Sequence, residues 1–451
     1  MSEKMAEGKI LETTTGVTVT IKKWLAEGGQ GDVYLVDYAG EEKILKWYKK
    51  VALGENSRMF YDNLVNNIHK QAPDEHFIWP EDITLYNNGY YGYIMEVLPD
   101  GYYEVGDFMN KTVMFKNYRV MIDAALNMVK AFRILHNAGM SYQDINEGNF
   151  AINPSNGDIK IMDNDNVAPS GIPTGVLGKP RYMAPEIVIG IGNHQKAIDE
   201  KAEYIPEFVM PNTQTDLYSM AIILYILFTL NHPMEGKHYL VPGLTAKIQE
   251  RLYGKDAAFM MENNGKGNGP DPIIHKNSLI IWPMLPKYIQ ELFLKALGQE
   301  GVKNPSKRPQ EVHWINALVR FRSDITTCPN CRMEVFVKDG RPCCCHRCSE
   351  LLKIPYRLEF MDYAIPGKKG ARIYSSQVKA VNNEDMLDIA GIVVSKPNDP
   401  SSLWILNKSD ESWRVTTPSG KSKRINPGEV LPLKDNLSFE ASGTTIKIKK
   451  N

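Results

Sequence analysis

The first part of the chain alternates short hydrophobic runs with glycine and charged residues, a pattern typical of antiparallel strands joined by hairpins. The runs VTVTIKKWL, DVYLVDYAG and KILKWY, between Val17 and about Trp47, predict a small sheet. The spacing of apolar residues becomes helical between Asn56 and Lys70, and Phe77 to Pro80 and Tyr90 to Leu98 are again strand-like. The residues before Val17 contain acids and no long apolar stretch, so we expect a short leader and no secretory signal.

Helices dominate the next part of the chain. Apolar residues at three- and four-residue spacing predict an amphipathic helix from Tyr118 to His136, with an apolar face made of Met121, Ala125, Met128, Phe132 and Leu135. Further helices are predicted to begin near Asp216 and near Pro286. The most apolar run, Met220 to Leu230, is much shorter than the roughly 20 residues needed to cross a bilayer, so we expect a buried core helix there.

The pattern changes once more toward the C-terminus. Residues from Arg320 to Thr327 are predicted to form a linker into a cysteine-rich segment. From about Ile354 onward, short β-branched and aromatic runs separated by Gly, Pro, Asn and Ser predict a small all-β module. Trp404 and Trp413 lie in two of these runs, and we expect both side chains in the core of the module.

Composition restricts the classes of partner. The 451 residues contain 53 Lys+Arg and 53 Asp+Glu, so the overall charge gives no indication of binding to nucleic acid or to an anionic membrane. All six cysteines fall between Cys328 and Cys348. This clustering favours a metal site in a reducing compartment over a disulfide framework, and it predicts a cytoplasmic protein.

The cysteine-rich segment contains two C-x-x-C pairs, CPNC and CHRC. Two thiolates from each turn would complete a tetrahedral structural zinc site, with the predicted ligands Cys328, Cys331, Cys345 and Cys348. Two alternatives stay open. Cys343 or Cys344 replaces Cys345 in the ligand set, or the whole cluster is redox-active.

A glycine-rich stretch, LAEGGQGDVYLV, places Gly28, Gly29 and Gly31 between two strand-like runs, with Val33 shortly beyond. Backbone N–H groups in such a loop can approach phosphates because no side chain intervenes. Alone, a loop of this kind is more often only a hairpin turn. The residues that follow decide between the two interpretations.

Further motifs occur in a fixed order after this loop. Lys46 lies in KILKWY, SYQDINEGNF places Asn149 five residues after Asp144, and the apolar run IKIM ends in Asp163. YMAPEI and NPSKRP then supply Glu186 and Arg308. Taken singly, each has a simpler explanation, such as an Asx-rich turn or a solvated lysine. Together, from Val17 to about Arg320, they resemble the motifs of protein kinases.

The resemblance implies a role for each polar residue at the phosphate-transfer site. Lys46 would hold the α- and β-phosphates of ATP, and Asp144 would orient the hydroxyl group of the substrate. Asn149 and Asp163 would bind magnesium.

Other residues receive structural or nucleotide-binding roles from the same resemblance. Glu186 and Arg308 would form a buried ion pair, and Asp216 would hold the catalytic loop through backbone N–H groups. As a simpler alternative, Asp216 is a helix N-terminal acid favoured by the helix dipole. The segment YIMEVL resembles the hinge that meets adenine, with Met95 as gatekeeper and Glu96 and Val97 contacting through their backbone, and Asp107 is a weaker candidate for a ribose contact.

The expected fold is therefore α+β: a leader (1–16), a kinase small lobe (17–98) and large lobe (99–322), a zinc ribbon (323–353) and an all-β interaction module (354–451) of forkhead-associated or immunoglobulin-like shape. The whole arrangement resembles bacterial Hanks-type Ser/Thr kinases of the tellurite-resistance and stress-response triads. That resemblance implies protein substrates, and as partners a metal-dependent phosphatase and a von Willebrand A-type protein. It implies ATP, magnesium and zinc as bound groups.

The sequence departs from the kinase pattern in the small lobe. Ala26 replaces the first glycine of the loop. The helix from Asn56 to Lys70 contains no glutamate to pair with Lys46, and its polar candidates near the expected place are Asp62, Asn63 and Asn66. An asparagine can donate a hydrogen bond but supplies no charge.

It also departs in the large lobe. Tyr142 and Gln143 replace the His-Arg pair before Asp144, so no adjacent arginine is available to bind a phosphorylated activation loop. Asn164 and Asp165 replace Phe and Gly after the magnesium aspartate, and Asp165 would add a carboxylate near the metal. Asn146 stands where Ser/Thr kinases carry a lysine.

Two other interpretations stay open beside an active kinase. The missing helix glutamate and the altered D-F-G motif favour a nucleotide-binding pseudokinase that recruits partners through its tail, whereas the retained Lys46, Asp144, Asn149 and Asp163 oppose it. A small-molecule kinase is the third possibility, and the A-P-E motif opposes that one.

Overall fold

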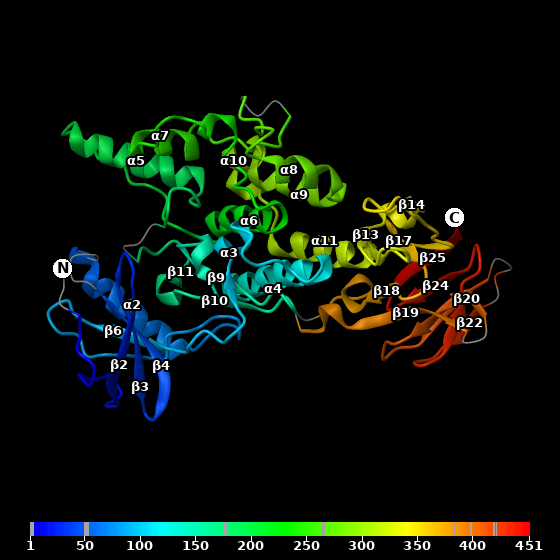
Figure 1. The fold of residues 1–451 in the computed structure, drawn as a ribbon, viewed down its shortest axis with the longest axis horizontal. Coiled ribbons are helices and arrows are strands. Elements are labelled where there is room, and N and C mark those ends of the chain that lie inside the picture. The colour runs from blue at the N-terminus through cyan, green and yellow to red at the C-terminus, as the bar shows by residue number, and fades with distance from the viewer. Residues whose placement is uncertain are drawn as a thin grey trace. The chain divides into compact units, whose positions relative to one another are not determined.

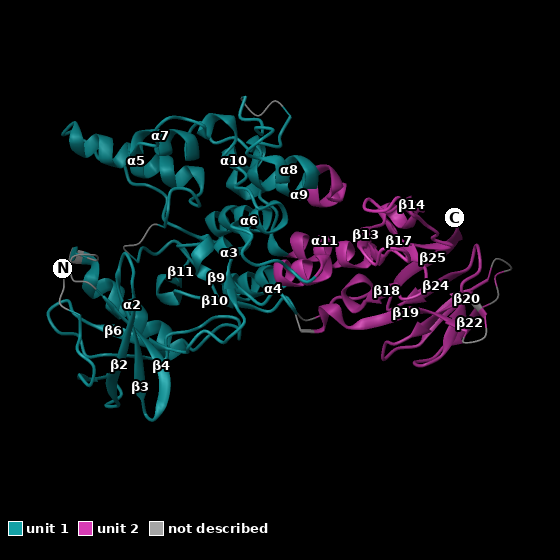
Figure 2. Ribbon diagram, viewed as in Figure 1, with its two compact units in different colours: residues 1–116, 127–282, 291–311 teal, residues 117–126, 283–290, 312–451 magenta. Residues whose placement is uncertain are grey.

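The computed structural model describes residues 4–48, 54–174, 178–263, 267–381, 384–396, 399–417, 420 and 422–451. The chain forms two compact units, coloured separately in Figure 2. The first contains residues 1–116, 127–282 and 291–311, and the second contains residues 117–126, 283–290 and 312–451.

A sheet of six strands, all paired antiparallel, opens the first unit, in the order β1-β2-β3-β4-β6-β5. Its strands β2, β3 and β4 are labelled and drawn in blue in Figure 1. The strands are β1 Ile10–Glu12, β2 Thr18–Glu27, β3 Gly31–Tyr38, β4 Glu41–Tyr48, β5 Asp82–Ile83 and β6 Gly92–Met95. Alternate residues of β2 and β3 are buried, as the period of two predicts. The first strand lies inside the predicted leader, because residues 10–12 pair with residues 18–20 of β2.

The helix α2 (Ser57–Lys70) forms within the predicted range. Its Phe60, Tyr61 and Leu64 pack in one cluster with buried tyrosines of the sheet. The strand predicted at Phe77 to Pro80 is wrong. Only an isolated bridge joins Phe77 to Ile161, and the strand that completes the sheet forms later, at β5.

The helices of the larger lobe are α3 Val105–Met109, α4 Tyr118–Asn137, α5 Pro185–Asp199, α6 Thr213–Thr229, α7 Ala246–Tyr253, α8 Lys276–Ile281, α9 Lys287–Leu297, α10 Gln299–Lys303 and α11 Glu311–Asp324. The three helices predicted after the small sheet form as α4, α6 and α9, and the other helices of the larger lobe were not predicted. The five residues predicted as the apolar face of α4 are all buried. Every residue of α6 from Thr215 to Thr229 is buried, so the most apolar run of the chain is a core helix.

Short strand pairs hold the loops that carry the kinase motifs. β8 (Met140–Ser141) pairs with β11 (Ala168–Pro169), and β9 (Phe150–Ile152) pairs with β10 (Ile159–Ile161) and with β7 (Tyr103–Glu104). The loop containing Asp144 therefore runs from β8 to β9. Asp163 follows β10 after a single intervening residue.

The predicted linker at Arg320 to Thr327 is wrong. α11 continues to Asp324 and β12 (Ile325–Thr327) follows at once, paired with β13 (Glu334–Phe336). Phe321, Asp324 and Ile325 are buried, which a solvated linker would not allow.

The C-terminal part of the second unit is all-β, as predicted. After the short pair β14 (Cys343–Cys344) and β15 (Leu351–Leu352), two antiparallel sheets have the orders β17-β16-β25-β24-β21-β22 and β18-β19-β20-β23. Their strands are β16 Tyr356–Glu359, β17 Ala364–Gly367, β18 Arg372–Tyr374, β19 Ile389–Lys396, β20 Asp399–Asn407, β21 Trp413–Thr416, β22 Ser422–Ile425, β23 Val430–Pro432, β24 Ser438–Ala441 and β25 Thr444–Lys450. Apolar residues from both sheets form one core, as in a β-sandwich.

The two tryptophans of this module differ. Trp413 is buried in the shared core and stacks on Phe439, with ring centroids 4.9 Å apart. The prediction for Trp404 is wrong, because its side chain is only half-buried and Lys396 Nζ lies 5.0 Å from its ring centroid. Trp404 points away from the core since its neighbours Leu403 and Ile405 point into it.

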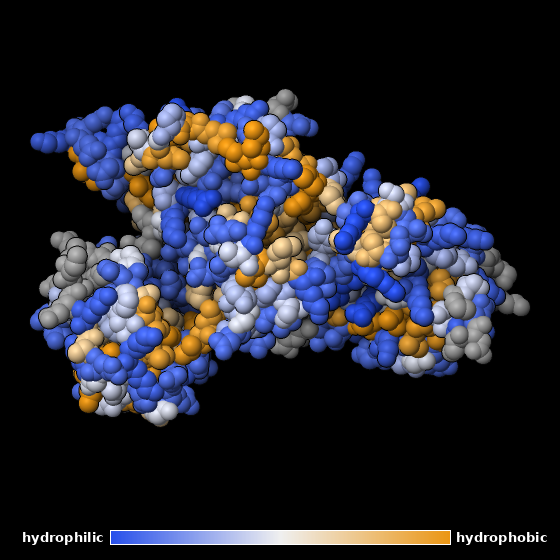
Figure 3. Space-filling model, viewed as in Figure 1, coloured by the Kyte–Doolittle hydropathy of each residue, from blue (hydrophilic) through white to orange (hydrophobic). Residues whose placement is uncertain are grey.

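Hydrophilic residues predominate on the face drawn in Figure 3, with hydrophobic patches between them. Among the helices of the described ranges, none is both long enough and apolar enough to span a membrane.

Candidate active site

Lys46 lies in β4 and its ammonium group is held by two carboxylates. Its Nζ is 2.8 Å from Asp165 Oδ2 and 3.2 Å from Asp163 Oδ1. The Tyr48 hydroxyl donates to the same Asp165 oxygen. Burial alone would lower the pKa of Lys46, but the charges of Asp165 and Asp163 outweigh it and raise that pKa above its ordinary value. Lys46 is therefore a permanently charged group in an enclosed position.

Asp165 has no exposed side-chain surface, and its second oxygen, Oδ1, has no hydrogen-bond partner among the described residues. A buried carboxylate oxygen without a partner is costly unless a cation reaches it. Asp163 differs, since 40% of its side chain is exposed, so its carboxylate faces the accessible space in front of Lys46. Asp163 also has a left-handed backbone (φ 53°), and hydrogen bonds of its neighbours hold it in this uncommon conformation.

One of those neighbours is Asn164, which stands where the kinase pattern has phenylalanine. Its buried Nδ2 donates to Ile78 O at 2.7 Å and to Ile161 O at 2.8 Å. Hydrogen bonds to two backbone carbonyls therefore stand here in place of the apolar packing that a phenylalanine would make. These bonds fix the loop that presents Asp163 and Asp165.

The loop between β8 and β9 brings Asp144 and Asn149 together. Asn149 Nδ2 donates to Asp144 O at 2.8 Å, which leaves the amide oxygen of Asn149 as the group able to approach a cation. Burial raises the pKa of the Asp144 carboxyl to about 6, although the charge of Lys179 opposes this shift. Asp144 Oδ1 is buried and has no hydrogen-bond partner among the described residues.

Asp216, at the start of α6, supports the same loop. Its Oδ2 accepts the backbone N–H of Tyr142 at 2.7 Å and lies 3.1 Å from His136 Nε2. The Tyr142 hydroxyl donates to the carbonyl of Met162, just before Asp163. Asp216 and Tyr142 together connect α6, the Asp144 loop and the Asp163 loop in one network.

Gln143 replaces the expected arginine and links two segments. It has a left-handed backbone (φ 59°), its Nε2 donates to Ile172 O at 2.7 Å, and its Oε1 accepts from Thr174 Oγ1 at 3.0 Å. The neutral side chain of Gln143 therefore connects the Asp144 loop to residues 172–174. An arginine at this position would instead bind a phosphorylated activation loop.

The predicted glycine-rich loop is the turn between β2 and β3, where Gly28 N donates to Gly31 O at 2.7 Å. Gly29 has open space around the position of a Cβ atom. A Cβ on Gly31 would lie 2.2 Å from Trp47 O, so this glycine is required by the close approach of β4. Val33 pairs with Lys46 in the β3–β4 register, which places both side chains on one face of the sheet.

The predicted hinge follows β6. Met95 ends that strand and is half-buried, whereas Glu96 and Val97 are exposed. The side chain of Glu96 forms an ion pair with Lys43 at 2.5 Å. Asp107 Oδ2 accepts the backbone N–H of Glu104 at 3.1 Å, so this candidate for a ribose contact already caps α3.

Glu186 and Arg308 meet in a bidentate ion pair. Arg308 Nη1 and Nη2 lie 2.7 and 2.8 Å from the two carboxylate oxygens of Glu186. The guanidinium also donates to the carbonyls of Gly301 and Gln214, and the arginine side chain is fully buried. The pair joins the start of α5 to the segment before α11.

The polar residues of α2 do not contact Lys46. Asp62 is exposed and pairs with Arg58 at 3.0 Å, and Asn66 is also exposed. Asn63 Nδ2 instead donates to Val167 O at 2.8 Å, and Asn67 Nδ2 donates to the same carbonyl at 2.7 Å. Two neutral amides thus attach α2 to the segment after Asp165, while the carboxylate that binds Lys46 comes from Asp165 itself.

The family model of the protein kinase domain matches residues 19–253, just over half of the chain. The chain therefore belongs to the protein kinase family, and its fold is the protein kinase fold followed by an all-β region. Among solved structures, the kinase domain of PknI from Mycobacterium tuberculosis, determined as a double mutant, is similar, with 15% identity and a TM-score of 0.43. That alignment covers 70% of this chain and 98% of the PknI chain. A comparison with curated proteins finds no match.

Protein kinase domains use ATP and magnesium, and the residues of this site fit both. The buried Oδ1 atoms of Asp144 and Asp165 have no hydrogen-bond partner among the described residues, and Asp163 faces the accessible space. Carboxylate and amide oxygens are the ligands that magnesium prefers in proteins. The fixed charge of Lys46 is suited to phosphate oxygens.

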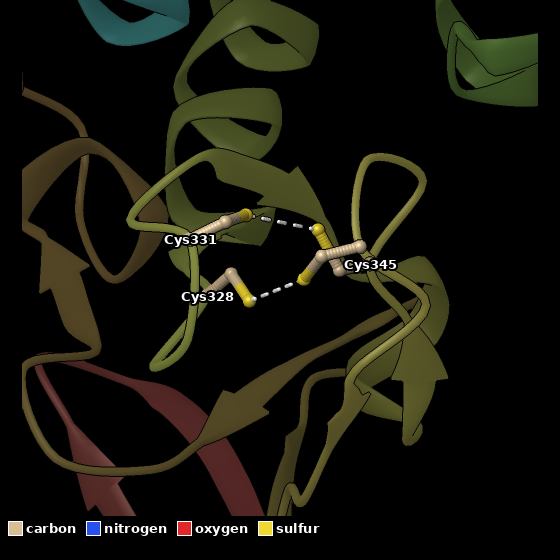
Figure 4. A group of neighbouring side chains, drawn as sticks. Cys328, Cys331 and Cys345 are labelled. Carbon is tan, nitrogen blue, oxygen red and sulfur yellow. Dashed lines mark hydrogen bonds between the residues drawn. The ribbon is translucent and has the colours of Figure 1, made fainter.

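The second unit contains a candidate metal site. The thiol sulfurs of Cys328, Cys331, Cys345 and Cys348 all lie within 4.8 Å of one another. Figure 4 shows side chains of this group, including the 3.6 Å contact between Cys331 and Cys345, and Cys328 Sγ is 3.6 Å from Cys348 Sγ. Zinc–sulfur bonds of about 2.3 Å would place the sulfurs of a tetrahedral site about 3.8 Å apart, which fits this cluster.

The remaining two cysteines lie outside the cluster. Cys343 Sγ is directed at the carbonyl of Phe336, and Cys344 is exposed. The two C-x-x-C turns have the same local form, because Arg332 and Ser349, each just after the second cysteine, both have left-handed backbones. Arg332 N donates to Cys328 O and Ser349 N donates to Cys345 O, so both turns are closed in the same way.

Proposed function

We propose that this chain is an active protein kinase that transfers the γ-phosphate of ATP to serine and threonine hydroxyls of proteins. The observation that carries the proposal is the double ion pair of Lys46 with Asp163 and Asp165. It joins the small sheet to the loop expected to bind magnesium. The preference for serine and threonine is proposed from the resemblance of the motifs to Ser/Thr kinases.

Each polar group has a separate task in this proposal. Lys46 binds the α- and β-phosphates, and the Gly28–Gly29 turn approaches them with backbone N–H groups. Asn149 and Asp163 hold magnesium, which neutralises charge on the phosphate oxygens when bound. Asp144 accepts the hydrogen bond of the substrate hydroxyl and orients its oxygen toward the γ-phosphorus.

Asp165 supports an active enzyme over a pseudokinase. The pseudokinase alternative depended on the altered D-F-G motif and on the missing helix glutamate, without which Lys46 would lack a fixed partner. Asp165 supplies a carboxylate at 2.8 Å, fully buried and further held by the Tyr48 hydroxyl. We propose that it performs the positioning role of the helix glutamate. Because it is only two residues after Asp163, this pairing does not depend on how α2 is oriented.

The proposal is tested with the purified full chain, γ-labelled ATP and magnesium, using casein and a set of small-molecule alcohols as separate acceptors. We expect labelled casein or labelled kinase, no labelled alcohol, and phosphoserine or phosphothreonine after acid hydrolysis. Label confined to the alcohols would favour the small-molecule kinase. The absence of transfer to any acceptor, with ATP still bound, would favour the pseudokinase.

The tail is proposed to contain a structural zinc site bound by Cys328, Cys331, Cys345 and Cys348. Their mutual distances fit a tetrahedral ion, and the cluster excludes Cys343 and Cys344. We further propose that the β-module recruits partners, among them a metal-dependent phosphatase and a von Willebrand A-type protein, in bacterial stress signalling in the cytoplasm. Thiols gathered at metal-ligand distances support a reducing compartment.

The zinc proposal predicts different behaviour for two adjacent cysteines. The wild-type chain should release about one zinc per chain on mercurial treatment, whereas Cys345→Ser should retain only a small fraction, because three thiolates leave a structural site incomplete. Cys344→Ser is the matched control and should release as much zinc as the wild type. The measurement is the absorbance of a zinc-sensitive dye. Full zinc content in Cys345→Ser with loss in Cys344→Ser would instead support the alternative ligand set.

A further inference from the structure

A second lysine reaches the loop that carries Asp144. Lys179 belongs to the segment that leads to the A-P-E motif, and its Nζ donates to Asn146 Oδ1 at 2.9 Å. Asn146 stands two residues after Asp144, at the position where Ser/Thr kinases carry a lysine. The side chain at this position is neutral here, but the ammonium group of another residue is attached to it.

Both ends of the Asn146 amide are fixed. Its Nδ2 donates to the carbonyl of Asp144 at 3.0 Å, and its Oδ1 also accepts the backbone N–H of Gly148 at 3.1 Å. The oxygen of the amide is therefore held toward Lys179. Hydrogen bonding to Asn146 therefore holds the Lys179 ammonium group beside the catalytic loop.

The backbone before Lys179 runs directly against Asp144. Gly178 has a left-handed conformation (φ +85°), and a Cβ atom there would lie 3.4 Å from Asp144 Oδ1 and 3.0 Å from Gln143 O. A larger residue at 178 would press on the catalytic loop. The charge of Lys179 also acts on the Asp144 carboxyl, whose pKa it lowers against the effect of burial.

We propose that Lys179 supplies the cation that stabilises the transferring phosphoryl group, in place of the lysine absent at position 146. This inference rests on the proposed kinase function. In the reaction, the bond between the γ-phosphorus and the bridging oxygen of ADP breaks, and the electron pair leaves with ADP. The substrate oxygen forms the new bond to phosphorus, and its proton passes to Asp144 and then to solvent. Charge on the γ-phosphate oxygens in the transition state is what the Lys179 ammonium neutralises.

Lys179 is exposed, so a substitution there should leave the fold intact. Removing one preorganised donor to a transition-state oxyanion typically lowers kcat by about 100-fold. We expect a loss of this order in Lys179→Met, with the KM for ATP changed less than about threefold, because Lys46 and the metal loop bind the nucleotide. Lys196→Met, an exposed lysine of α5, is the matched control and should keep the wild-type kcat.

A relocation variant makes the test specific to the position of the charge. Asn146→Lys combined with Lys179→Gln moves the ammonium group to the other side of the same contact. We expect the kcat of this double variant to be at least about tenfold higher than that of Lys179→Met. A wild-type kcat in Lys179→Met, or a relocation variant as slow as Lys179→Met, would overturn the inference while the kinase function stands. A wild-type chain that transfers no phosphate would overturn both.

Discussion

Replacing Asp165 with asparagine is expected to lower kcat by about 100-fold and to leave the protein folded. Asp165→Asn removes the charge that holds Lys46 Nζ at 2.8 Å, although Asp163 remains within reach at 3.2 Å. Hydrogen bonds to charged groups contribute about 1.5–3 kcal/mol, which corresponds to about 10- to 150-fold in rate. We expect an effect near the upper end, because the freed ammonium group would draw the Asp163 carboxylate away from the position in which we propose that it binds magnesium.

The matched control is Asp62→Asn in α2. Asp62 lies on the helix where a kinase glutamate was expected, but its carboxylate is exposed and pairs with Arg58. The rate of phosphate transfer in Asp62→Asn should stay within about twofold of wild type, because exposed ion pairs contribute little. Steady-state kinetics of the two variants at saturating ATP make the comparison. If Asp62→Asn is slow and Asp165→Asn is fully active, the carboxylate that positions Lys46 belongs to α2, and the role proposed for Asp165 is contradicted.

Replacing Arg308 with methionine is expected to destabilise the first unit by about 3–5 kcal/mol, because it leaves the partly buried Glu186 carboxylate without its partner. Arg308 has no exposed side-chain surface and donates to two backbone carbonyls in addition to Glu186. Urea unfolding followed by tryptophan fluorescence measures the change.

Two further variants separate the ion pair from simple loss of packing. The double variant Glu186→Gln with Arg308→Met should be more stable than Arg308→Met alone, because no uncompensated charge remains. Arg58→Met removes one member of an exposed pair and should cost less than about 0.5 kcal/mol. Equal stability of Arg308→Met and wild type would contradict the structural role of this pair.

Sequence patterns predicted the elements that have a clear period or a hydrophobic core to cover. The apolar face of α4 and the buried α6 follow directly from residue spacing, and the glycine and aromatic runs located the strands of the small sheet. Motif order also located the loops containing Asp144 and Asp163. Each of these predictions depends on local sequence, which fixes which side of an element faces inward.

Contacts between residues far apart in the chain could not be predicted from the sequence. The Phe77 to Pro80 strand was wrong because the available partner, Ile161, offers only a single bridge. The prediction that Trp404 is buried was wrong because a tryptophan in a strand can face either the core or the solvent. The link from Lys46 to Asp165 joins residues far apart in the chain, and the only signal for it was an acid at a position where kinases carry glycine.

The rate of phosphate transfer from γ-labelled ATP, measured side by side for the wild type and Asp163→Ala, tests the central claim most directly. The account predicts magnesium-dependent incorporation in the wild type and a loss of at least about 1,000-fold in Asp163→Ala, since in the proposed mechanism this carboxylate would hold the metal at the phosphates. Equal rates in the two proteins would contradict it.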